Sequence, residues 1–382
     1  LSFVYIDEIL DRYIVADSLD LFKYISQKRY LSSTLYSTNL IHHSMSPTSK
    51  APLSILACNS GLNFAKRIVK SLRKKYGDEV HLIDSEEMHF ASTELKTVIN
   101  ESIRGKDVFI VQDCENHTEG KCTDQNLRAL YTMVDACRRC DAERITTVLP
   151  SYPYARQDKQ SGREGITAAR IAYELEGDGS VDHLITIDLH NSAIQGFFRR
   201  AKIDNLMGGY VLVPTLKKMI KDKENTVIMP TDLGGAKRAN HYAQSLRTDI
   251  AFTYKVRNYC KANTVDKISI LGDVKGKDVY IVDDMICTGG TLVKALEETK
   301  NMGAKKVVAV CTHALFNGPA WERFHEAYEK GFLDMVIGTD STYHSKEFLE
   351  KSPWFKEVSI ANYFADTISR INQRKSITDL LD

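Results

Sequence analysis

The sequence predicts an α/β protein with two doubly wound domains, each built on a parallel β-sheet. Short runs of apolar and β-branched residues recur along the chain, and longer amphipathic stretches separate most of them. Strands that are apolar throughout are typical of parallel sheets with helices on both faces. The chain has 382 residues, and at about 100–200 residues per domain this length favours two domains.

The order of these runs gives the expected elements. Strands are expected at 53–57, 79–83, 107–112, 144–150, 182–188, 226–230, 249–254, 278–284, 306–312 and 334–339. Helices are expected at 61–76, 123–140, 208–222, 233–247, 290–303 and 318–330. The chain therefore alternates strand and helix along most of its length.

The domain limits follow from breaks in this alternation. Residues 1–50 are interpreted as an N-terminal extension and linker, with helical periodicity followed by a polar stretch. We expect an N-terminal α/β domain over 51–205 and a C-terminal α/β domain over 206–365. The tail, 366–382, is expected to join the N-terminal domain.

Composition excludes several classes of function. Lys and Arg number 51 against 50 Asp and Glu, so the formal net charge is only +1. This balance argues against a nucleic-acid partner and against an anionic membrane, since both need a surplus of cations. No apolar run approaches the ~20 residues of a membrane span. The first residues do not resemble a secretory signal, and the eight cysteines are interpreted as reduced thiols, so a cytoplasmic location is expected.

Three local patterns have both a functional and a structural interpretation. Cys137 and Cys140 form a C-x-x-C, which is either half of a zinc site or one face of a helix; we favour the helix. His42 and His43 could bind a metal, but a solvated pair in a polar linker is favoured. The basic run 66–75 could bind phosphate, but a solvated helix face is favoured.

The most specific motif is VYIVDDMICTGGT at 279–291. An apolar strand delivers Asp283 and Asp284 at its carboxyl end, and a turn with two glycines then opens a helix. Free N–H groups at a helix start favour a phosphate, and acidic side chains accept hydrogen bonds from sugar hydroxyls. A tight turn with a capping Thr is the structural alternative, which the paired acids disfavour. No Walker A or GxGxxG pattern occurs in the chain.

This segment resembles the phosphoribosyl-binding loop of the type I phosphoribosyltransferase fold. Further segments resemble ribose-phosphate pyrophosphokinases, also called phosphoribosyl pyrophosphate synthetases; they lie at 101–107, 133–140, 151–172, 186–198, 203–209, 228–239 and 311–324. The resemblance covers roughly 53–382. It implies two domains of that fold and Mg²⁺-dependent transfer of the β,γ-pyrophosphoryl group of ATP to the anomeric hydroxyl of ribose 5-phosphate, with AMP released. It also implies a homo-oligomer in which dimers form hexamers and ATP binds between subunits.

The resemblance also assigns roles to residues of this chain. Binding of ATP falls to Phe90, Glu94, Arg156, Gln157 and Asp158. The hydroxyls and the 5-phosphate of ribose 5-phosphate are expected to be bound by Asp283, Asp284, Thr288, Gly289, Gly290 and Thr291. By the same resemblance, the magnesium ion is expected to be bound by His190 and Asp232. Lys255 and Arg257 are expected to stabilise the charge of the transferred phosphoryl group. Phe90 and Glu94 are expected to reach ATP in a neighbouring subunit.

Several departures from the family pattern affect these assignments. The segment FASTE at 90–94 lacks the usual Asp and Gly, Cys287 stands in place of an Asp, and one residue is missing between 158 and 163. Asn191 and Ala193 alter another motif and remove a Gln. These changes motivate an alternative, a catalytically weak or silent regulatory homologue. A phosphoribosyltransferase that consumes the same product is a less favoured alternative.

The site at which phosphate activates part of the family is also altered. Arg104, Ser376 and Thr378 match parts of it, but Asp141 replaces a Ser. Because a carboxylate repels phosphate, the sequence predicts weakened or absent activation by inorganic phosphate.

Overall fold

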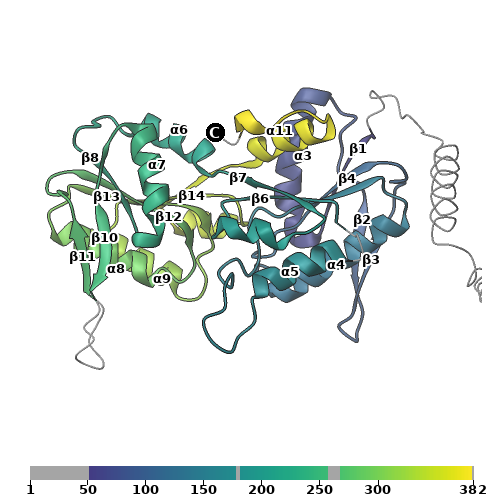
Figure 1. Cartoon of the computed structure of the whole chain (residues 1–382), viewed down its shortest axis with the longest axis horizontal. Coiled ribbons are helices and arrows are strands. Elements are labelled where there is room, and N and C mark those ends of the chain that lie inside the picture. Colours follow the sequence, from purple (N-terminus) through teal and green to yellow (C-terminus); the bar gives the residue numbers. More distant parts are fainter. Residues whose placement is uncertain (1–50, 178–180, 257–266, 381–382) are drawn as a thin grey trace, which may run out of the picture. The chain divides into compact units, whose positions relative to one another are not determined.

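The computed structural model describes residues 51–177, 181–256 and 267–380 (Figure 1). Residues 51–382 form one compact unit. The predicted extension 1–50, with His42 and His43, lies outside the described residues.

The first half of the unit is built on a five-stranded sheet in the order β1-β4-β5-β6-β7. Its strands are β1 (Leu53–Ala57), β4 (Asp107–Val111), β5 (Arg144–Val148), β6 (His183–Ile187) and β7 (Lys202–Leu206). Every neighbouring pair is parallel. The helices beside this sheet are α3 (Leu62–Tyr76), α4 (Thr123–Arg139) and α5 (Thr167–Glu176). Buried apolar side chains of α4 and α5 share one core cluster and those of α3 another, so the sheet has a core on each face.

The second half is built on a six-stranded parallel sheet in the order β15-β14-β13-β12-β8-β9. Its strands are β8 (Thr226–Pro230), β9 (Asp249–Ile250), β12 (Asp278–Ile286), β13 (Lys306–Ala314), β14 (Met335–Thr339) and β15 (Phe355–Val358). The helices beside it are α6 (Gly209–Met219), α7 (Ala236–Leu246), α8 (Gly290–Asn301), α9 (Ala320–Glu329) and α10 (Lys346–Lys351). Helices α6 and α7 share one core cluster, and α8 and α9 share another.

Two antiparallel ribbons extend from these sheets. One pairs β2 (Ser85–His89) with β3 (Leu95–Ile99), and the other pairs β10 (Phe252–Val256) with β11 (Lys267–Leu271). Figure 1 shows them near opposite ends of the described unit. The hydroxyl of Thr253 donates to the carbonyl of Pro230 at 2.7 Å, which ties β10 to the end of β8.

The two halves are joined by contacts between distant segments. Helix α11 (Ala361–Asn372) packs on α3, where the rings of Phe64 and Phe364 meet edge to face at 5.3 Å. Arg67 of α3 donates to Glu357 at 3.0 Å and also bonds to Asp340. The C-terminal helix therefore lies against the first half, while the domain limits at 205 and 365 stay a prediction.

Most expected elements form, with some differences. At 79–83 there is no strand but a single parallel bridge between Ile55 and Leu82. The expected strand 249–254 divides into β9 and β10, which join different sheets. The elements without a sequence prediction are β2, β3, β7, β11, β15, α5, α10 and α11. Cys137 is buried in the core of the first half, as its helix interpretation expects, and Cys140 is exposed. None of the helices in the described ranges is long and apolar enough to cross a membrane.

Candidate functional site

The carboxyl ends of β8 and β12 place predicted site residues at one edge of the second sheet. Asp283 and Asp284 lie near the end of β12, which continues to Ile286. Strand β8 ends at Pro230, which is paired in register with Val282. Asp232 follows two residues later, so it stands at the same edge; its carboxylate accepts from the N–H of Gly234 at 2.9 Å. This is where open α/β sheets bind their ligands.

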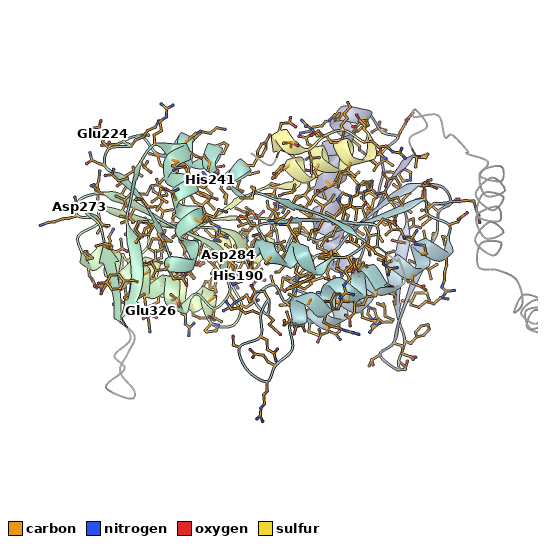
Figure 2. The ribbon with its side chains drawn as sticks, viewed as in Figure 1. His190, Glu224, His241, Asp273, Asp284 and Glu326 are labelled. Carbon is orange, nitrogen blue, oxygen red and sulfur yellow. The ribbon has the colours of Figure 1, made fainter. Side chains whose placement is uncertain are left out.

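A direct contact links this edge to the first sheet. The Nδ1 of His190, which follows β6, lies 2.5 Å from Oδ2 of Asp284, and Figure 2 shows the two side chains together. Arg238 adds a cation 3.9 Å from the same carboxylate. His190 and Asp284 are 94 residues apart in the chain. Residues predicted for the metal and for ribose 5-phosphate are therefore neighbours in space.

The two adjacent acids have opposite electrostatic environments. Burial of its carboxyl, joined by the hydrogen bond and the charge of Asp284, raises the pKa of Asp283 to about 7. Burial would also raise the pKa of Asp284, but the hydrogen bond with His190 holds it below its usual range. The same hydrogen bond raises the pKa of His190. Asp284 is therefore the anionic member of the pair, and Asp283 takes up a proton more readily.

The loop after β12 forms the turn that the sequence predicts. Gly289 has a φ of +72°, and α8 begins at Gly290. A Cβ on Gly289 would lie 2.5 Å from Cε2 of Phe324, so only glycine fits there. A guanidinium N–H of Arg323 donates to the carbonyl of Thr288 at 2.8 Å. The loop from Thr288 to Thr291 thus leads directly into a helix N-terminus, which suits a phosphate.

A cavity of about 460 Å³ lies beside this loop. Both halves contribute to its lining, which consists of Glu115, Thr123, Ser151, Tyr152, Tyr154, Ala155, Arg156, Gln157, Met285, Cys287, Leu315 and Asn317. Two of the predicted ATP residues, Arg156 and Gln157, therefore face the same space as the residues just before the glycine turn. The third, Asp158, accepts from the side-chain amide of Asn191 at 2.6 Å, beside His190.

The other two predicted ATP residues lie elsewhere. Phe90 and Glu94 close the turn of the β2–β3 hairpin, where the N–H of Phe90 donates to the carbonyl of Glu94 at 3.0 Å. The Phe90 side chain is 48% exposed, and neither residue lines the cavity. Within one chain, the structure does not bring them to Arg156.

The predicted catalytic pair is described only in part. Lys255 lies in β10, where its backbone is paired with that of Ile268 across the ribbon. Arg257 lies outside the described residues.

The residues of the predicted phosphate-activation site form two local pairs. Arg104 donates to the carboxylate of Asp141 at 2.6 Å, and both side chains are exposed. In the C-terminal segment, the hydroxyl of Ser376 donates to that of Thr378 at 3.0 Å. The guanidinium of Arg104 thus already has an anionic partner from its own chain.

Sequence reasoning missed several polar residues where the two sheets meet. His313 of β13 is buried, with Nε2 3.1 Å from the carbonyl oxygen of Ile187, and burial lowers its pKa. The hydroxyl of Thr312 bonds to the carboxylate of Asp188. In the cavity wall, the amide of Asn317 donates to the sulfur of Cys287 at 3.8 Å. Polar residues at the ends of apolar runs were the available signal for Thr312 and His313.

The donor set at this edge suits a hydrated cation better than an enclosed one. Among the described residues, no group of three or more His, Cys, Asp or Glu side chains gathers as a metal cage. His190 follows β6 and is 39% exposed, and Asp232 follows β8. A cation held by one or two side chains, with waters and substrate phosphates as further ligands, matches the coordination habit of Mg²⁺.

Comparisons with known proteins cover most of the chain. The family described as the N-terminal domain of ribose phosphate pyrophosphokinase matches residues 53–179, and the phosphoribosyl transferase domain family matches 215–346. A ribose-phosphate pyrophosphokinase of Campylobacter jejuni is 38% identical over 328 residues, which are 85% of this chain and 98% of that protein. A Vibrio cholerae protein of the same name is 39% identical over 84% of this chain and 98% of its own length. The crystal structure of phosphoribosylpyrophosphate synthetase from Mycobacterium smegmatis matches with a TM-score of 0.75 and 31% identity, over 85% of this chain and 99% of that one.

Proposed function

The chain belongs to the ribose-phosphate pyrophosphokinase family, and we propose that it transfers the β,γ-pyrophosphoryl group of ATP to the anomeric hydroxyl of ribose 5-phosphate. The products are phosphoribosyl pyrophosphate and AMP. The observation that supports this function is that residues proposed for ATP and residues proposed for ribose 5-phosphate lie beside the same cavity. Arg156 and Gln157 share a cavity with the segment that leads from Asp283 and Asp284 into the glycine turn.

Each substrate has a set of residues suited to it. Asp283 and Asp284 accept hydrogen bonds from the ribose hydroxyls, and the turn from Thr288 to Thr291 holds the 5-phosphate at the start of α8. Arg156 forks onto the phosphate oxygens of ATP, as a guanidinium is suited to do. The two substrates thus meet between the two sheets.

Magnesium is the proposed cofactor, held through His190 and Asp232. The ion neutralises charge on the ATP phosphates when it is bound. Because His190 already contacts Asp284 at 2.5 Å, the chain's own hydrogen bond keeps the imidazole near the ribose site. The hydrogen bond from Asn191, the residue after His190, to Asp158 ties this segment to the proposed ATP residues.

The proposed catalytic cations are Lys255 and Arg257. In phosphoryl transfer, negative charge spreads over the transferred group, and positioned cations stabilise it. Lys255 lies in β10 of the ribbon whose base is tied to Pro230, two residues before Asp232. This anchoring supports a position of the start of β10 near Asp232, one of the proposed magnesium ligands.

The proposal also includes the oligomeric state of the protein and its location in the cell. Since the hairpin turn with Phe90 and Glu94 is exposed and lines no part of the cavity in its own chain, it is available to reach ATP in a neighbouring subunit of a homo-oligomer built from dimers. A hexamer is the assembly that we propose, and the cytoplasm is the proposed location.

The test is formation of AMP from ATP and ribose 5-phosphate in the presence of Mg²⁺, followed by chromatography. We expect AMP and phosphoribosyl pyrophosphate in equal amounts, and no AMP without ribose 5-phosphate. Binding of both substrates without turnover would instead favour the alternative of a silent regulatory homologue, which the altered 90–94 and 287 positions motivate. Release of ADP rather than AMP would overturn pyrophosphoryl transfer.

Inorganic phosphate is expected to have little effect on the initial rate. Asp141 places a carboxylate 2.6 Å from Arg104, and a second anion at this guanidinium would meet electrostatic repulsion. Replacing Asp141→Ser removes that carboxylate, so we expect the variant to gain a rate increase across a millimolar phosphate titration.

Asp135→Asn is the matched control, because Asp135 pairs with another exposed arginine, Arg139, on α4. It should respond to phosphate as the unaltered enzyme does. Strong stimulation of the unaltered enzyme, or an Asp141→Ser variant that stays unresponsive, would contradict the role given to Asp141.

A further inference from the structure

One acidic residue of the cavity has no role in the reaction as described so far. Glu115 lies in the segment between β4 and α4 and lines the same cavity as Arg156 and Gln157. Its side chain is partly buried, and burial alone raises the pKa of its carboxyl. The side-chain hydrogen bonds and ion pairs found across the described ranges include none to its carboxylate.

The chain around Glu115 is held in place by contacts to other elements. The side-chain amide of Asn116 donates to the carbonyl of Ser60 at 2.9 Å. Further along, Lys121 lies 3.3 Å from the carboxylate of Glu87, and both side chains are mostly buried. These contacts hold the chain at Asn116 and at Lys121, the two ends of the stretch that follows Glu115. The backbone at Glu115 is therefore held beside the cavity that this residue lines.

An unpartnered carboxylate that loses hydration costs free energy unless a ligand supplies a hydrogen-bond donor. A phosphate cannot be that ligand, because its oxygens carry negative charge and accept hydrogen bonds. The ribose 5-phosphate hydroxyls are already matched by Asp283 and Asp284. Among the groups of the two substrates, the nucleoside of ATP is left as the source of the donor.

We propose that Glu115 accepts a hydrogen bond from the 6-amino group of adenine and thereby selects ATP over purine nucleotides with a 6-oxo group. This inference rests on the proposed function. A carboxylate has only acceptors at neutral pH, so it attracts an amino group and repels a carbonyl oxygen. Specificity of this kind comes from a polar group left unpaired by the wrong substrate. Glu115 would make this contact from within the chain, whereas Phe90 and Glu94 would approach from a neighbouring subunit.

The experiment compares ATP with inosine triphosphate, which carries an oxygen in place of the 6-amino group. In Glu115→Gln the amide can donate to that oxygen. We expect the ratio of kcat/KM for ATP to that for inosine triphosphate to fall roughly tenfold, mainly through KM, because one hydrogen bond to a charged group is exchanged. Glu115→Leu should lose affinity for ATP and, because leucine removes the repelling charge but cannot donate to the 6-oxo group, should gain less affinity for inosine triphosphate than Glu115→Gln does.

Glu119→Gln is the matched control, since Glu119 lies in the same segment, is exposed, pairs with Lys121 and does not line the cavity. It should keep the nucleotide preference of the unaltered enzyme. An unchanged preference in Glu115→Gln would overturn the proposal. A changed response to 2′-deoxyadenosine triphosphate instead of inosine triphosphate would also overturn it, because the ribose would then be the partner.

Binding measured without turnover separates this inference from the proposed function. The α,β-methylene analogues of the two triphosphates, in which the bond that pyrophosphoryl transfer breaks cannot be cleaved, report on the base contact even if no AMP forms. A tenfold shift in the ratio of their dissociation constants in Glu115→Gln would support the contact with the base. An absence of AMP with unaltered protein would overturn only the reaction. Thermal unfolding of each variant, together with Glu115→Asp, shows whether a loss of binding comes from a loss of fold.

Discussion

Replacing Lys255→Ala is expected to lower kcat about 10³-fold while the dissociation constant for ATP changes little. The cation is proposed to act on charge that develops as the pyrophosphoryl group leaves AMP, so its loss raises the barrier more than it weakens the ground state. Arg257→Ala should behave in the same way. The measurement is AMP formation at saturating substrates, combined with direct binding of the non-hydrolysable ATP analogue.

Lys275→Ala provides the control, because Lys275 is an exposed lysine in the turn before β12. It should retain the kcat of the unaltered enzyme. Lys255→Ala should unfold at the temperature of the unaltered protein, because a two-stranded ribbon can accommodate one alanine in a strand. Lys275→Ala should unfold at that temperature as well. A Lys255→Ala enzyme with full kcat would remove this residue from the mechanism, and a joint loss of kcat and thermal stability would assign it a structural role.

The sequence predicted the core of the fold because its sheets are parallel and covered on both faces. Strand β13 buries every residue but its first, and β12 buries Val279 to Val282 without a break, so both contain continuous apolar runs. The ribbons lack that pattern: β2, with the sequence SEEMH, has no buried residue, and it is held by pairing with β3 and by the contacts of Glu87 with Asn59 and Lys121. Strand β7 carries Lys202, Asp204 and Asn205 at the edge of its sheet, where alternation is weak. Such strands follow from tertiary contacts rather than from local periodicity.

The candidate site divides in the same way. Asp283, Asp284 and the glycine turn were predicted because one short segment contains a strand end, two acids and a helix start. The contact of His190 with Asp284 joins residues 94 positions apart and depends on how two sheets meet. Glu115 lies in a connecting segment without a motif, Asn317 lies in a segment whose resemblance gave it no role, and only the cavity brings them together. Local chemistry can therefore be inferred from the sequence, whereas the sharing of one cavity by two halves requires the structure.

Replacing Gly289→Ala is expected to raise the KM for ribose 5-phosphate at least tenfold and to lower the free energy of unfolding by about 1–3 kcal/mol. The residue has a φ of +72°, and its new Cβ would lie 2.5 Å from Cε2 of Phe324. Phe324 cannot move aside easily, because it is fully buried and stacks on Trp354 at 5.7 Å between ring centroids. The strain must therefore fall on the turn itself, and the backbone N–H groups that would hold the 5-phosphate shift with it.

Gly276→Ala separates the two causes of this effect. Gly276 has a φ of +73°, but no atom would lie within 4 Å of its Cβ. This variant carries only the cost of the left-handed backbone, about 1 kcal/mol, and should keep the KM of the unaltered enzyme. If the two alanine variants lost equal stability and Gly289→Ala kept its KM, the contact with Phe324 would not determine the shape of the phosphate turn. A larger loss in Gly289→Ala, with KM raised for ribose 5-phosphate and not for ATP, would show that packing beneath the turn holds it in the form that binds phosphate.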